Sequence, residues 1–158
     1  MADFAKTLAR AQISQLSLEE QARGFSHKFT INYSDCNSGT VSTDTDTVTL
    51  GVLPSLWVVN GAGANVTTAW TGSTGTYAMV VGTTTTTNAF IASTSVKTAG
   101  WLVGSVSPAA LTNATATASK NIVAIFTDTV AGAATSNTAG VVDVYLNIID
   151  LTSPNKLG

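Results

Sequence analysis

The stretch that decides the fold is VVDVYLNIIDL, residues 141–151. Its apolar side chains occupy every second position: Val142, Val144, Leu146 and Ile148. The positions between them, 143, 145 and 147, hold Asp, Tyr and Asn. Successive side chains of a strand point to opposite faces of a sheet, so this period of two predicts a strand with one face toward a core.

The same period recurs along the preceding chain. Phe25, His27, Phe29, Ile31 and Tyr33 alternate with polar residues and predict a first strand. Turn residues separate further strand-like segments, which are residues 48–52, 56–60, 65–70, 76–82, 88–96, 101–106 and 122–130. In this interpretation, Gly61-Ala62-Gly63 interrupts two of them. Eight or nine short strands without intervening helices predict an all-β fold, an antiparallel β-sandwich that is jelly-roll-like.

The first 24 residues have a different pattern. Phe4, Leu8 and Ala11 follow helical spacing, and Ser17-Leu18-Glu19-Glu20 fits a helix-capping box that Gly24 would close. We therefore expect an N-terminal arm with a short helix at 1–24, a sandwich domain at 25–151 and a C-terminal tail at 152–158. Short helices are marginal in water, so the arm needs a surface, either on its own sandwich or on another subunit.

The composition excludes several classes of partner. Charged residues make up 10% of the 158 residues, the net charge is −2, and Thr supplies about one residue in six. The few Lys and Arg form no cluster, so neither nucleic acid nor an anionic membrane is an expected partner. The first residues lack the apolar core of a signal peptide, and no apolar run is long enough to span a bilayer, so we expect synthesis in a cytoplasm.

Candidate catalytic groups are sparse. His27 is the only histidine and Cys36 the only cysteine, so neither a His-based catalytic triad nor a zinc site is expected. Asp44 and Asp46 have the spacing of a loose calcium site, but no third acidic residue or glycine follows in register, so an Asp-containing turn that leads into a strand explains them better. We therefore expect a protein that is not an enzyme and needs no cofactor or metal.

Two groups of residues suggest binding to a partner. The first is the set of tryptophans, which serve either as core anchors or as exposed contact residues: Trp57, Trp70 and Trp101. The second is the set of apolar side chains in the arm, which precede a domain that is complete without them: Phe4, Leu8, Ile13, Leu16 and Leu18.

The segment DTVTLGVLPSLWVVNGAGANVTTAW, residues 46–70, is followed by TYAMVVG and the closing VVDVYLNIID. This pattern resembles small Thr/Gly-rich β-sandwich virion proteins of tailed bacteriophages, specifically head decoration (cement) proteins. Its marks are Leu53-Pro54, Val66-Thr67-Thr68-Ala69-Trp70 and Val81-Gly82. The resemblance implies a homotrimer on the outer capsid surface that binds and clamps major capsid subunits. The helical arm departs from a minimal decoration sandwich and is either the clamp or the mark of a fibre or tail role.

Three alternatives remain open at this stage. A carbohydrate- or receptor-binding module would use the tryptophans to stack on sugars. A jelly-roll capsid subunit would build the shell itself, although the chain lacks a basic arm to face nucleic acid. A hydrolase would need a pair of Asp residues, and no motif indicates one.

Overall fold

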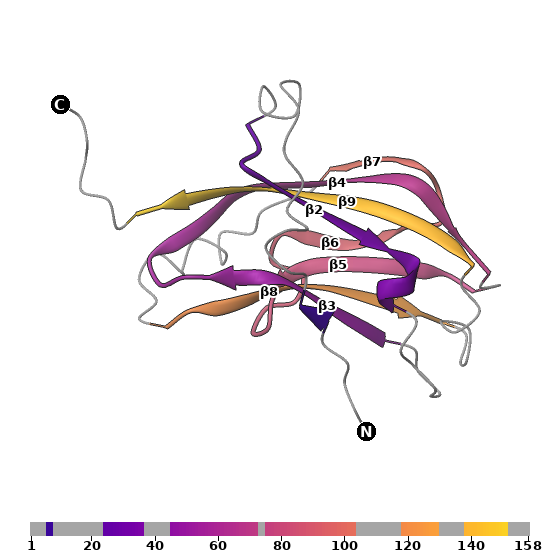
Figure 1. Cartoon of the computed structure of the whole chain (residues 1–158), viewed down its shortest axis with the longest axis horizontal. Coiled ribbons are helices and arrows are strands. Elements are labelled where there is room, and N and C mark those ends of the chain that lie inside the picture. The colour runs from indigo at the N-terminus through magenta and orange to yellow at the C-terminus, as the bar shows by residue number, and fades with distance from the viewer. Residues whose placement is uncertain are drawn as a thin grey trace.

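The computed structural model describes residues 6–7, 24–36, 45–72, 75–103, 118–129 and 138–151. They form two layers of strands (Figure 1). The elements are β1 (Lys6–Thr7), β2 (His27–Asn32), the 3-10 helix η2 (Tyr33–Cys36), β3 (Thr45–Leu53), β4 (Trp57–Thr71), β5 (Tyr77–Thr83), β6 (Ile91–Ser95), β7 (Gly100–Val103), β8 (Lys120–Asp128) and β9 (Ala139–Asp150). The expected all-β, sandwich-like fold is confirmed.

Each layer is one sheet. The first has the strand order β1-β3-β8-β5-β6 and the second has the order β2-β9-β4-β7. Apart from the parallel pair β1–β3, all pairings are antiparallel. Partners are nested along the chain: β2 pairs with β9, β3 with β8, β4 with β7, and β5 with β6. The chain therefore folds back on itself as one long antiparallel ribbon that closes around a core.

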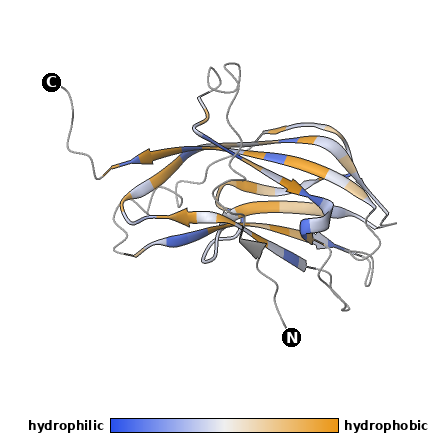
Figure 2. Cartoon of the chain, in the orientation of Figure 1, coloured by the Kyte–Doolittle hydropathy of each residue, from blue (hydrophilic) through white to orange (hydrophobic). Residues whose placement is uncertain are grey.

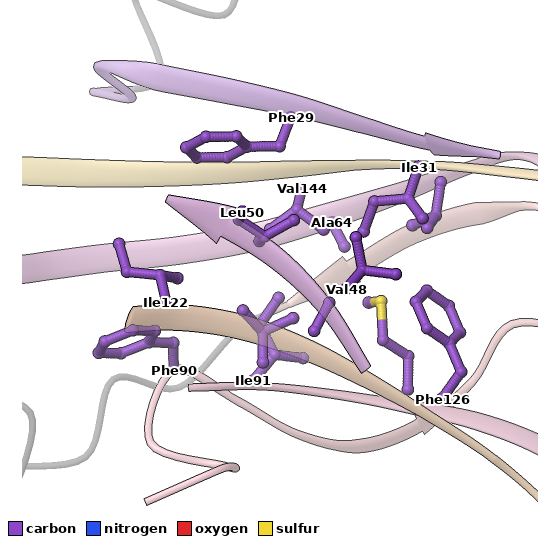
Figure 3. Packing of buried hydrophobic residues seen from close by; sticks show 14 of the residues in the cluster. Phe29, Ile31, Val48, Leu50, Ala64, Phe90, Ile91, Ile122, Phe126 and Val144 are labelled. Carbon is purple, nitrogen blue, oxygen red and sulfur yellow. The ribbon is translucent and has the colours of Figure 1, made fainter. Parts of the chain in front are cut away.

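The core lies between the two sheets. Figure 3 shows Phe29, Ile31 and Val144 of one sheet pointing toward Val48 and Ile122 of the other. The predicted inward residues of β9 are confirmed, because Val142, Val144 and Leu146 are fully buried and Ile148 packs against the core. Figure 2 shows hydrophobic residues, in orange, along the strands of both layers. Burial of this apolar surface is the main stabilising contribution to the sandwich.

Three stacked aromatic rings fill one part of the core. Trp70 lies 5.2 Å from Phe126 and 6.1 Å from Tyr77, measured between ring centroids. All three side chains are at most 1% exposed. Gly140 packs against the Trp70 ring, and its φ of +154° is one that L side chains rarely adopt. A side chain at this position would therefore meet both backbone strain and the indole.

Two sequence predictions within the strands were wrong. In the predicted strand at 48–52, Val48, Leu50 and Val52 alternate with Thr and Gly and would therefore share one face, but the β3–β8 register shifts between Thr49 and Gly51. This bulge leaves Val52 60% exposed and turns Leu53 into the core. The glycine-rich segment 61–63 was expected to separate two strands, but β4 runs continuously from Trp57 to Thr71.

The helix expected in the arm is not found among the described residues. Lys6–Thr7 instead form β1, which adds to the edge of β3 beside Val48 and Thr49. Strand pairing supplies backbone hydrogen bonds to an open sheet edge, and this outweighs a weak local helical preference. The rest of residues 1–23, which includes the proposed capping box, and the tail at 152–158 lie outside the described residues.

Candidate functional site

The outer face of the β2-β9-β4-β7 sheet carries a distinctive group of side chains. Two register rows cross it from strand to strand. One row pairs Thr30 of β2 with Asp143 of β9, then Asn65 of β4, then Trp101 of β7. The other row pairs Lys28 with Tyr145 and then Gly63. Positions that are opposite each other in a sheet share a face, so these residues form one continuous surface.

Three aromatic rings meet on this surface, and we call Phe25, Trp101 and Tyr145 the aromatic patch. The Tyr145 ring centroid lies 5.3 Å from that of Phe25 and 5.1 Å from that of Trp101. Gly63 makes this possible, because a Cβ there would lie 3.2 Å from Cζ of Phe25. A glycine inside a strand usually weakens the strand. Gly63 compensates for this by leaving space for the Phe25 ring.

The rings differ strongly in exposure. Tyr145 is only 2% exposed, although the alternation of β9 places it on the outer face, because Phe25 and Trp101 cover it. Trp101 is 44% exposed. Trp101 therefore presents aromatic surface to solvent, and Tyr145 holds it in place from the side.

A polar network borders the aromatic patch. The Lys28 ammonium lies 3.1 Å from Oδ2 of Asp143, and Thr30 Oγ1 donates a 2.6 Å hydrogen bond to Oδ1. The same ammonium lies 5.4 Å from the Tyr145 ring centroid, within the range of a cation–π contact. Asp143 is 7% exposed, so these partners compensate a carboxylate that has lost most of its water. The network is close to electrically neutral.

The structure separates the three tryptophans. Trp57 is half-buried and packs against the core, and Trp70 is 1% exposed within the aromatic stack. Trp70 is therefore too deeply buried to contact a partner. Of the three, Trp101 combines 44% exposure with a position on the outer face of its sheet. The arm residues proposed as contacts, which are Phe4, Leu8, Ile13, Leu16 and Leu18, lie outside the described residues.

Sequence reasoning did not select Phe25, Lys28, Asn65, Asp143 or Tyr145 as site residues. A signal for two of them was present, since the alternation in 141–151 places Asp143 and Tyr145 together on the outer face. Nothing in the sequence indicated that Trp101 and Phe25 would converge on Tyr145. That convergence depends on strand pairings between distant segments of the chain.

The other reactive groups are largely enclosed. Burial lowers the pKa of His27, whose Nδ1 lies 2.8 Å from Oγ of Ser26 and whose ring stacks on Phe29. Cys36 is fully buried. Asp46 of the suggested calcium pair is 5% exposed in β3, and Asp44 lies outside the described residues. Within the described ranges, no three His, Cys, Asp or Glu side chains are grouped to hold a metal ion.

Comparison with protein-family models, curated proteins and solved structures found no match to this chain. Among the residues that the structure describes, no helix has the length and apolar character needed to cross a membrane.

Proposed function

We propose that this chain is a structural virion protein that decorates and stabilises a bacteriophage capsid by binding major capsid subunits. The fold assignment that accompanies this proposal is a jelly roll. The nested pairing of β2 with β9, β3 with β8, β4 with β7 and β5 with β6 supports it, because two interleaved Greek keys of eight strands pair in this order. Jelly rolls build viral shells and lectins, so the fold is compatible with assembly but does not by itself define a function.

The observation that carries the proposal is the chemistry of the sheet edges. β6 and β7 are the terminal strands of their sheets, and neither Ile91–Ser95 nor Gly100–Val103 contains a charged residue. Soluble proteins usually protect an edge with charge, proline or a bulge, because an open edge can pair with another chain. The β6 edge has an irregularity in its register with β5 but no charge, and the β7 edge has neither a charge nor a shift in its register with β4. Edges without charge are suited to burial against a neighbouring subunit.

The N-terminal arm provides a second support. β1 already shows that a segment ahead of the sandwich can add to a sheet edge, since Lys6 and Thr7 pair with Val48 and Thr49. Among the residues that the structure describes, β1 pairs with two of the nine residues of β3. We propose that the chain forms a homotrimer in which arms and edges contact neighbouring subunits. Repeated weak contacts of this kind give strong binding on a lattice.

Charged edge variants test the proposal. Ser93→Lys combined with Ser95→Lys adds two positive charges to β6 at exposed positions. The matched control is Thr127→Lys with Asn121→Lys, which adds the same charge at exposed positions of β8, inside the same sheet. Binding is measured by co-sedimentation with capsids assembled from the major capsid protein of the same genome, and oligomeric state by light scattering.

We expect the unmodified protein to co-sediment and the β6 variant to bind at least tenfold more weakly, which corresponds to about 1.4 kcal/mol. The β8 variant should bind as the unmodified protein does. Failure of the unmodified protein to bind capsids would contradict the decoration role. Equal binding by both variants would contradict the role of the β6 edge.

A further inference from the structure

We propose that the aromatic patch binds a neutral sugar, with one pyranose ring stacked on Trp101 and a ring hydroxyl hydrogen-bonded by the neighbouring Asn65. This activity goes beyond capsid decoration and does not depend on it. It assigns a ligand to the outer face of the β2-β9-β4-β7 sheet, whereas the capsid proposal concerns the sheet edges and the arm.

The first argument is the state of the Trp101 ring. Its centroid lies 5.1 Å from that of Tyr145 with 32° between the ring planes, and the residue is nevertheless 44% exposed. The contact with Tyr145 limits the orientations that the indole can adopt, so ligand binding costs little additional side-chain entropy. A pyranose has a face of C–H groups that packs on such an aromatic surface.

The second argument is the position of the polar groups. Asn65 is the register partner of Trp101 on one side and of Asp143 on the other. Neighbouring strands are about 4.8 Å apart, so the amide and then the carboxylate follow the indole at steps of this size. The side-chain amide of Asn65 both accepts and donates hydrogen bonds in a plane, which suits the hydroxyls around the edge of a sugar ring. Asp143 is 7% exposed and already bound by Thr30 and Lys28, so it forms the polar border of the site and leaves the ligand to Asn65.

The third argument is charge. Lys28 pairs with Asp143 at 3.1 Å, so the surface beside the aromatic patch is balanced. A charged ligand would have to compete with this pair, whereas an uncharged polyol complements a neutral face. Within the aromatic patch, Trp101 is the one exposed ring, since Tyr145 is 2% exposed and Phe25 is half-buried, while a stable protein interface buries about 800 Å² on each partner. A small neutral ligand fits this face better than a protein does.

The test uses the full chain and the indole N–H signals of its tryptophans in a two-dimensional ¹H–¹⁵N NMR spectrum. The signal of Trp101 is assigned from its loss in Trp101→Phe. The probes are the methyl pyranosides of glucose, galactose and mannose, together with N-acetylglucosamine, each titrated through the millimolar range. We expect at least one of the four sugars to shift the Trp101 signal saturably and to leave the signal of the buried Trp70 unchanged.

Three variants separate sugar stacking from a loss of structure. The Trp101 variants lack the indole signal, so their binding is followed by the backbone amide signals of Asn65 and its strand neighbours in the same spectrum. Trp101→Ala should weaken binding about tenfold or more, because an aromatic contact contributes roughly one power of ten in affinity. Trp101→Phe keeps a ring and should retain part of the affinity, and Asn65→Ala should weaken binding without removing the ring. The control is Val52→Ala, which changes an apolar residue that is 60% exposed on the other sheet and should leave affinity unchanged.

Two results would overturn the inference. One is that none of the four sugars shifts the Trp101 signal. The other is that Trp101→Ala and Asn65→Ala, with spectra that show an intact fold, bind the sugar as tightly as the unmodified protein does.

Discussion

Gly140 provides the sharpest test of how the core is packed, through the substitution Gly140→Ala. A Cβ at this position would lie 2.3 Å from Cδ2 of Trp70, well inside van der Waals contact. The indole has little room to move, because it is 1% exposed and stacks against Phe126 and Tyr77. The backbone adds a second penalty, since φ is +154°.

The expected loss of stability combines these two effects. A rarely populated backbone conformation costs about 1–3 kcal/mol, and overpacking a core costs about 1–3 kcal/mol. Together they predict a loss of about 4 kcal/mol, a large fraction of the roughly 5–15 kcal/mol that stabilises a domain. For a chain of this size the melting temperature should fall by about 10 °C or more.

Two other glycines separate the two contributions. Gly100 has a φ of +139° with no atom within 4 Å of a Cβ, so Gly100→Ala should show the backbone strain alone. Gly51 has open space and no positive φ, so Gly51→Ala should have little effect. Urea unfolding followed by tryptophan fluorescence gives the three free energies of unfolding. If Gly140→Ala is as stable as Gly51→Ala, the close packing of Gly140 on Trp70 is refuted.

Three further predictions concern buried polar groups. Asp143→Ala leaves Lys28 and Thr30 without their shared acceptor and should cost about 1–3 kcal/mol in urea unfolding, whereas an unchanged midpoint would show that the network adds no stability. Because burial lowers the pKa of His27 below its unfolded value of about 6.5, the folded state binds a proton less readily than the unfolded state. The contribution of neutral His27 to the free energy of unfolding is therefore present above pH 6.5 and is lost as the pH falls through the folded pKa. His27→Gln should flatten this part of the pH–stability profile. An identical slope in the variant would contradict the lowered pKa of His27. Cys36 is fully buried, so its thiol should react with a water-soluble disulfide reagent only on unfolding, and rapid reaction of the native protein would contradict this burial.

The fold class followed from local patterning, because alternation depends only on which face of a strand is buried. For residues 141–151 this was sufficient to identify every inward residue from Val142 to Ile148. The prediction failed at Val52 because a single bulged residue reverses the faces beyond it, and no sequence signal marked the bulge. It also failed at 61–63, where the glycines resemble a turn but lie within β4, and Gly63 leaves room for the Phe25 ring.

The aromatic patch was less predictable for a physical reason. The local sequence does not determine whether a tryptophan in an alternating strand faces the core or the solvent. For Trp101, the pairing of β4 with β7 and β9 places the side chain on the outer face. Trp70, on the same strand as Asn65, faces inward and joins the core. Only the register of distant strands distinguishes the two residues, and a single sequence does not contain that register in readable form.

The nested strand order has a consequence for how the protein is made. β9 is the last described strand along the chain and lies in the interior of its sheet, between β2 and β4. The hydrogen bond from Thr30 to Asp143 joins residues that are 113 positions apart. During synthesis, the edges of β2 and β4 that face β9 therefore remain without their hydrogen-bond partner until β9 is translated, after almost every other strand. Contacts of such long range fold slowly, and the waiting edges are exposed to aggregation. A ribosome that stalls before β9 releases a product with a gap in the middle of one sheet, and we expect such fragments to be insoluble.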